Sequence, residues 1–99
     1  ASDVYKRQLL KDGESVFREL IMIKVRVTAA QRGEINSIAD IFRAKIVDVQ
    51  EESMIIELTG TQSKLEGFMN LLKGYEILEL ARTGITGLSR GCEDVTYIG

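Results

Sequence analysis

The chain has 99 residues and a net charge of −2, with one cysteine and no histidine. This length allows one domain with a modest core, and the charge balance offers no electrostatic footprint for nucleic acid or an anionic membrane. The lack of histidine removes the commonest general base and metal ligand. Because no apolar run approaches the roughly 20 residues of a membrane span and no signal-peptide pattern is present, we expect a cytoplasmic protein without membrane contact.

The two ends of the chain differ in composition from its middle. Residues 1–15 are polar and mixed in charge, and residues 2–8 resemble a translated sequencing adaptor, so we expect a linker or a non-native N-terminal tail. Residues 84–99 carry Gly84, Gly87 and Gly91 and predict a flexible, irregular tail. The folded domain is therefore expected over residues 16–83.

The first half of this domain predicts a strand followed by a helix. Apolar and polar residues alternate over residues 16–27, which places one set on one strand face: Ile21, Ile23, Val25 and Val27. Thr28 with Gln31 three residues later predicts a capping box at a helix start. A helical stripe follows: Ile35, Ile38, Ala39 and Phe42.

The second half repeats this plan after a hairpin. Residues 44–49 and 54–59 predict two strands joined by a short polar turn. Ser63 and Glu66 predict a second capping box, and Gly74 is the expected residue just beyond that helix. A second helical stripe lies between them: Leu65, Phe68, Met69 and Leu72. Residues 77–82 predict the last strand.

This order of elements predicts an α+β fold of the ferredoxin-like type, βαββαβ. Right-handed crossovers place both helices on one face of a four-stranded antiparallel sheet. The other sheet face then presents Leu20 and Met22. A partly apolar, uncovered sheet face usually meets another chain, so we expect a homodimer or a contact with a different protein.

No set of residues predicts catalysis, a cofactor site or a metal site. Glu51 and Glu52 form a carboxylate pair, but they lie at the expected hairpin turn without a further ligand nearby, which favours a solvated turn. Lys24 and Arg26 lack a glycine-rich phosphate loop and favour a charged surface. Cys92 has acidic neighbours and no histidine to activate it, which argues against a catalytic nucleophile.

The segment after the last strand leaves two interpretations open. It contains glycines, a single leucine and two arginines, which is poor material for a core. It is either a disordered terminus or a docking segment in which Leu88 is an apolar anchor and Arg82 and Arg90 are polar contacts. The residues of this segment and those on the open sheet face are together the candidate partner contacts: Leu20, Met22, Arg82, Thr83, Leu88, Ser89 and Arg90.

Five short motifs in register resemble one known family. They are Arg18-Glu19-Leu20 before Ile23-Lys24-Val25, then Ile41 to Val49, Glu57 to Thr61 with Lys64-Leu65, Ile77 to Gly84, and Leu88 to Gly91. In this order and spacing they resemble the C-terminal domain of the acetolactate synthase small subunit, also called the acetohydroxyacid synthase regulatory subunit. The resemblance covers residues 16–91.

The resemblance implies a non-catalytic subunit with a ferredoxin-like C-terminal domain. In this family the small subunit binds and activates a large catalytic subunit that carries thiamine diphosphate, magnesium and usually FAD. That enzyme condenses pyruvate with a second 2-oxo acid on the pathway to valine, leucine and isoleucine. An N-terminal ACT domain senses the effector, commonly valine, and we expect that domain to be missing from this chain.

Two hypotheses of different classes follow. The first is a regulatory module that contacts the catalytic large subunit and forms a homodimer. The alternative is a free-standing, ACT-like sensor that binds an amino acid at its own dimer interface. Activation of the large subunit favours the first, and binding of valine or leucine by the isolated chain favours the second.

Overall fold

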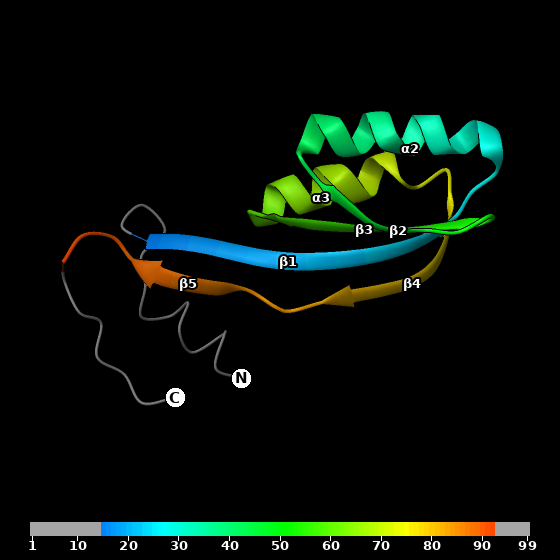
Figure 1. The fold of residues 1–99 in the computed structure, drawn as a ribbon. Helices are drawn as coiled ribbons and strands as arrows, with labels where there is room; N and C mark the ends of the chain where they lie inside the picture. The colour runs from blue at the N-terminus through cyan, green and yellow to red at the C-terminus, as the bar shows by residue number, and fades with distance from the viewer. Residues whose placement is uncertain (1–14, 93–99) are drawn as a thin grey trace.

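The computed structural model describes residues 15–92, which form two helices and five strands (Figure 1). In chain order the elements are β1 (Ser15–Arg26), α2 (Ala29–Phe42), β2 (Lys45–Val49), β3 (Ser53–Gly60), α3 (Gln62–Leu71), β4 (Glu76–Arg82) and β5 (Thr86–Ser89). The order of the first six elements confirms the expected βαββαβ plan.

The sheet is built around the 12-residue strand β1, and every pairing in it is antiparallel. Its order is β2-β3-β1-β4, so β2 and β4 are the two edges. The C-terminal part of β1 pairs with both β3 and β4, whereas its N-terminal end pairs with β5. Figure 1 shows that this end of β1 and β5 form a two-stranded arm that extends beyond the helices.

Both helices lie on the same face of the sheet and close the hydrophobic core (Figure 1). The apolar residues of β1 and β3 that face the helices are fully buried, as the alternation predicts. Phe68 of α3 meets Phe42 of α2 edge to face, with ring centroids 5.4 Å apart. The core consists of Ile21, Ile23, Val25, Val27, Ile35, Met54, Ile56, Leu58, Leu65, Phe68 and Leu72.

The helix ends confirm one sequence prediction and correct two others. Thr28 and Gln31 form the expected reciprocal capping box of α2. The N-cap of α3 is Thr61 rather than Ser63, because Thr61 has an extended backbone and its side chain accepts a hydrogen bond from the Lys64 amide. Gly74 is not a left-handed residue beyond α3, since its φ is not positive and that helix ends in a tight turn at Leu72.

The expectation of an irregular segment after residue 83 is wrong for residues 86–89, which form β5. Its pairing partner Phe17 explains the presence of glycine in this strand. A Cβ on Gly87 would lie 2.5 Å from the Phe17 ring, so a larger residue at this position would clash with the ring where it now lies. The tail prediction for residues 93–99 and the linker prediction for residues 1–14 lie outside the described residues.

Candidate interaction surfaces

The sheet face opposite the helices carries a small apolar hollow. Met22, Ile55 and Ala81 line it from three adjacent strands, and Met22 is 40% exposed. An ion pair between Lys24 and Glu79 closes one side. Leu20 lies on the same face, half-buried. Two of the candidate contacts, Leu20 and Met22, are therefore brought together where the sequence predicted them.

Thr83 is exposed and holds the end of β4 against β1. Its amide donates to the Leu20 carbonyl oxygen at 3.0 Å, and its hydroxyl oxygen accepts from the Leu20 amide at 3.0 Å. This exchange continues the ladder by one residue beyond the end of β4. The position of Thr83 is thus fixed by its own chain.

Arg82 lies on the helix side of the sheet and is bound to Glu19. The guanidinium donates to both carboxylate oxygens, at 2.6 Å and 3.2 Å. The Glu19 side chain is only 7% exposed, whereas that of Arg82 is 37% exposed. The hydrogen bonds to Glu19 raise the pKa of Arg82 above its usual value, with a smaller contribution from the charge of Glu66. These two hydrogen bonds link β4 to β1 and hold Arg82 at the rim of a groove between α3 and β4.

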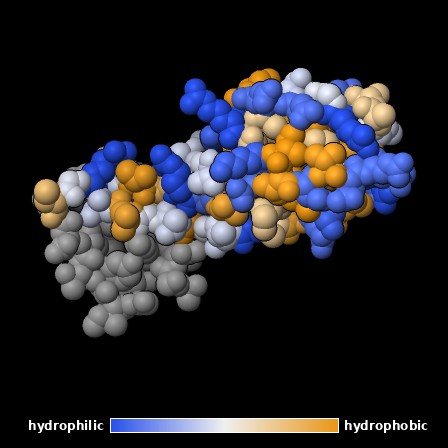
Figure 2. Space-filling model, viewed as in Figure 1, coloured by the Kyte–Doolittle hydropathy of each residue, from blue (hydrophilic) through white to orange (hydrophobic). Residues whose placement is uncertain are grey.

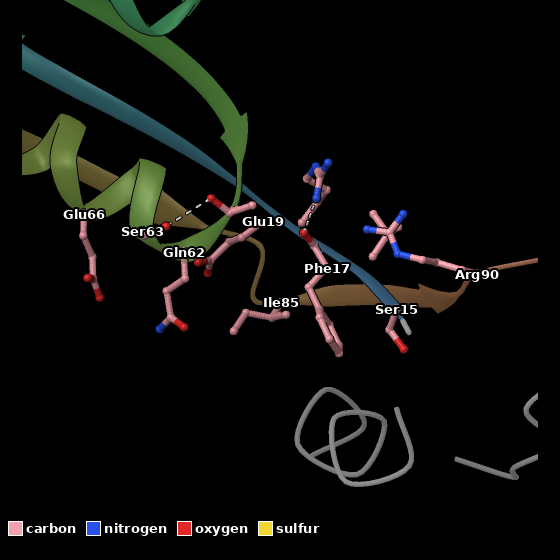
Figure 3. Close-up of a pocket in the computed structure, with 11 residues that line it drawn as sticks. Ser15, Phe17, Glu19, Gln62, Ser63, Glu66, Ile85 and Arg90 are labelled. Carbon is pink, nitrogen blue, oxygen red and sulfur yellow. Dashed lines mark hydrogen bonds between the residues drawn. The ribbon is translucent and has the colours of Figure 1, made fainter. Parts of the chain in front are cut away.

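The remaining candidates lie on the arm. Leu88 of β5 is 72% exposed, which is an unusual exposure for a leucine in a strand, and Ser89 follows it at the strand end. Arg90 lies just beyond, at an open pocket between the arm and the start of α3 (Figure 3). Figure 3 shows Phe17, Glu19 and Ile85 along the arm side of this pocket and Gln62, Ser63 and Glu66 along the helix side.

Sequence reasoning missed a third surface, between α3 and β4. Simple alternation over residues 77–82 places Leu78 and Leu80 on one strand face, but β4 contains a bulge opposite Lys24 and Val25. The bulge places Ile77 and Leu80 together on the helix side, where both line a groove with Met69 of α3. A bulge has no reliable sequence signal, so periodicity alone does not reveal this groove.

Within residues 15–92, no group of three or more His, Cys, Asp or Glu side chains is arranged to hold a metal ion. Neither of the two described helices is long and apolar enough to cross a membrane. What this part of the chain does present is apolar surface on the sheet face, the arm and the β4 edge. The fold defines a ferredoxin-like α+β domain.

Comparison with known proteins identifies the family. The family model described as "Small subunit of acetolactate synthase" matches residues 18–91. The small subunit from Mycolicibacterium smegmatis is 48% identical over 82% of this chain, and the one from Bacillus subtilis is 43% identical over 92%. The chain belongs to the acetolactate synthase small-subunit family and corresponds to its C-terminal domain.

A solved structure supports the same assignment. The crystal structure of the small subunit from Thermotoga maritima aligns with a TM-score of 0.76 and 44% sequence identity over 83% of this chain. The matched region covers 50% of that protein and 48% of the Mycolicibacterium smegmatis relative. The chain therefore spans about half the length of the relatives it matches.

Proposed function

We propose that the chain acts as part of the regulatory subunit of acetolactate synthase. It binds the large, thiamine-diphosphate-dependent catalytic subunit and raises its rate of condensing pyruvate with a second 2-oxo acid. This reaction serves the cytoplasmic biosynthesis of valine, leucine and isoleucine. The observation that carries the proposal is the family match over residues 18–91.

The chemistry of the surface supports a binding role. The hollow around Met22 is apolar at its centre and is bordered by the Lys24–Glu79 ion pair. An apolar centre with a charged rim is the usual anatomy of a protein interface. Exposed Leu88 on the arm offers a second apolar anchor for the same partner. We therefore assign Met22 and Leu88 as contacts with the catalytic subunit, and Arg90 as a polar contact beside them.

A reconstitution tests this proposal. The chain is titrated into purified large subunit from the same source, and the rate of acetolactate formation is followed. We expect a saturable increase in rate. Met22→Lys places a charge in the apolar hollow and should shift the titration to higher concentration by at least about tenfold, as expected for a buried anchor.

The matched control is Ile41→Lys on α2. The Ile41 side chain is more exposed to solvent than that of Met22. It lies on helix α2, however, and not on the open face of the sheet. This variant should activate like the unmodified chain. A rate that does not change at any ratio of the two proteins would contradict the proposed function, and an equal loss in both variants would contradict the assigned surface.

A further inference from the structure

The two helices leave one strand of the main sheet uncovered. Helix α2 packs on β2 and β3, and α3 packs on β3 and β1. All seven residues of β4 are exposed, and Ile77 and Leu80 on its helix side are 44% and 46% exposed. Packed helices lie about 8–10 Å apart and strands about 4.8 Å apart, so a further helix beside α3 would lie directly above β4. The sheet therefore leaves room for one more helix along this side.

That place is a groove between α3 and β4. The groove has a volume of about 570 Å³, and its lining is mainly apolar. Figure 2 shows apolar side chains gathered around α3, on the side of the molecule that Figure 1 also shows. The apolar lining residues are Ile23, Met69, Leu72, Tyr75, Ile77 and Leu80. Apolar side chains placed in this groove would be removed from water, which favours binding.

The charges around the groove differ in whether they have partners. The three charged residues of β4 are each paired with a residue of β1: Glu76 with Arg26, Glu79 with Lys24 and Arg82 with Glu19. Glu66 of α3 and Lys73 just beyond it also line the groove, and neither forms an ion pair with another described residue. They are seven residues apart in the chain, which is about 10 Å along the axis of α3. The groove thus offers one negative and one positive charge to a partner, at opposite ends.

We propose that an amphipathic helix of the catalytic large subunit occupies this groove, antiparallel to α3. The inference rests on the proposed function and gives it a second contact, on the side of the sheet opposite Met22. A backbone that enters an apolar groove must already have its amides and carbonyls hydrogen-bonded, and a helix meets this condition by itself. The charges and the bulge of β4 argue against a strand that pairs along this edge.

The two unpaired charges determine the direction of the helix. A basic residue of the occupant would pair with Glu66 and an acidic residue with Lys73, about seven helical residues apart. Acidic residues stabilise the first turn of a helix and basic residues stabilise the last turn. The occupant therefore begins at Lys73 and ends at Glu66, which is antiparallel to α3. Between these ends, its apolar residues at i, i+3, i+4 and i+7 would contact Met69, Ile77 and Leu80.

The first test compares variants of the chain in the rate titration with the large subunit. Leu80→Lys places a charge in the groove and should raise the concentration for half-maximal activation at least about tenfold. Leu71→Lys is the matched control, because Leu71 of α3 is 50% exposed but does not line the groove. Glu66→Lys with Lys73→Glu exchanges the two charges and should weaken activation as much as Leu80→Lys does. Equal effects of the two leucine variants, or no effect of the charge exchange, would overturn the proposal.

The second test changes no residue and so does not depend on the folding of a variant. The chain has three methionines in three different places: Met69 in the groove, Met22 on the open sheet face and Met54 in the core. In an NMR spectrum of isotope-labelled methionine methyl groups, saturating large subunit should shift the Met69 signal and leave that of Met54 in place. An unchanged Met69 signal would contradict the inference. A Met69 signal that moves with the concentration of the chain alone would show that a second copy fills the groove, which would also contradict it.

The third test asks whether the occupant is a helix. In a Cys92→Ser background, Asn70→Cys carries a photoreactive benzophenone label at the groove. The residues of the large subunit that it captures should recur every three or four positions, as along one face of a helix. Captured residues at every second position would identify a strand and would refute the proposed occupant.

The outcomes separate this inference from the proposed function. If Met22→Lys weakens activation and Leu80→Lys does not, the function stands and the groove is not a contact. If the unmodified chain neither activates nor binds the large subunit, both the function and the inference are wrong.

Discussion

Three ion pairs connect strands β1 and β4, and for two of them the structure predicts very different effects when the pair is broken. Glu19 and Arg82 meet on the helix side, where the Glu19 carboxylate is almost fully buried. Lys24 and Glu79 meet on the open face, where both are substantially exposed. Changing Arg82 or Lys24 to methionine removes the charge and keeps most of the aliphatic stem. Both variants therefore introduce the same side chain, and both remove an ion pair between the same two strands.

The expected costs follow from what each change leaves behind. Arg82→Met leaves the Glu19 carboxylate buried without its two charge-assisted hydrogen bonds, and breaking a fully buried pair in this way costs about 3–5 kcal/mol. Because the guanidinium is 37% exposed, water can reach part of the site, and we expect a loss of about 2–3 kcal/mol. Lys24→Met breaks an exposed pair, whose contribution is about 0–1 kcal/mol.

Urea unfolding followed by circular dichroism measures both free energies of unfolding. The double variant Glu19→Leu with Arg82→Met supplies the control, since removing both charges leaves no unpaired carboxylate and should recover much of the loss. The reasoning is refuted if Arg82→Met costs no more than Lys24→Met. It is also refuted if the double variant is as unstable as the sum of its single changes.

Three further predictions concern single positions. Gly87→Ala should destabilise the arm by at least about 1 kcal/mol in urea unfolding, because its Cβ would overlap the Phe17 ring; an unchanged midpoint would contradict this packing. Gly33→Ala should stabilise the chain by about 0.5–1 kcal/mol in the same assay, because alanine favours the helical backbone more than glycine does. Helix α2 has open space for the added methyl group. The hydrogen bond that Tyr75 donates to Glu34 raises the Tyr75 pKa above 10.0, so the stability from this bond is present below pH 10 and is lost as the pH rises through the higher folded value. Tyr75→Phe should remove that loss, and an ultraviolet titration in which the Tyr75 phenol ionises at or below pH 10 would disprove the link.

The fold followed from the sequence because its signals are local and mutually consistent. Alternation in β1 and the two helical stripes identified the buried faces, and Thr28 with Gln31 marked the start of α2. The second helix start was misplaced because Thr61 and Ser63 are both good capping residues two positions apart. Only the point where β3 ends selects Thr61, and that point is set by pairing with Glu19 of β1.

The features that were missed depend on contacts between distant parts of the chain. The glycine-rich segment after β4 resembled a flexible tail, yet Gly87 is required because Phe17 lies across from it, 70 positions earlier. Arg82 resembled a free contact, but its partner Glu19 is likewise distant in sequence. The groove beside β4 depends on a bulge that shifts Ile77 to the helix side. Register and bulges arise from tertiary pairing, which single-sequence periodicity does not encode.

The most direct test of the regulatory role is the binding of this chain to the catalytic subunit from the same source. Sedimentation velocity of a mixture, with one partner carrying a fluorescent label, measures complex formation without relying on catalysis. The account predicts a saturable complex that Met22→Lys weakens and Ile41→Lys does not. If the two proteins sediment independently at every concentration tested, the chain does not hold the catalytic subunit and the proposed function is wrong.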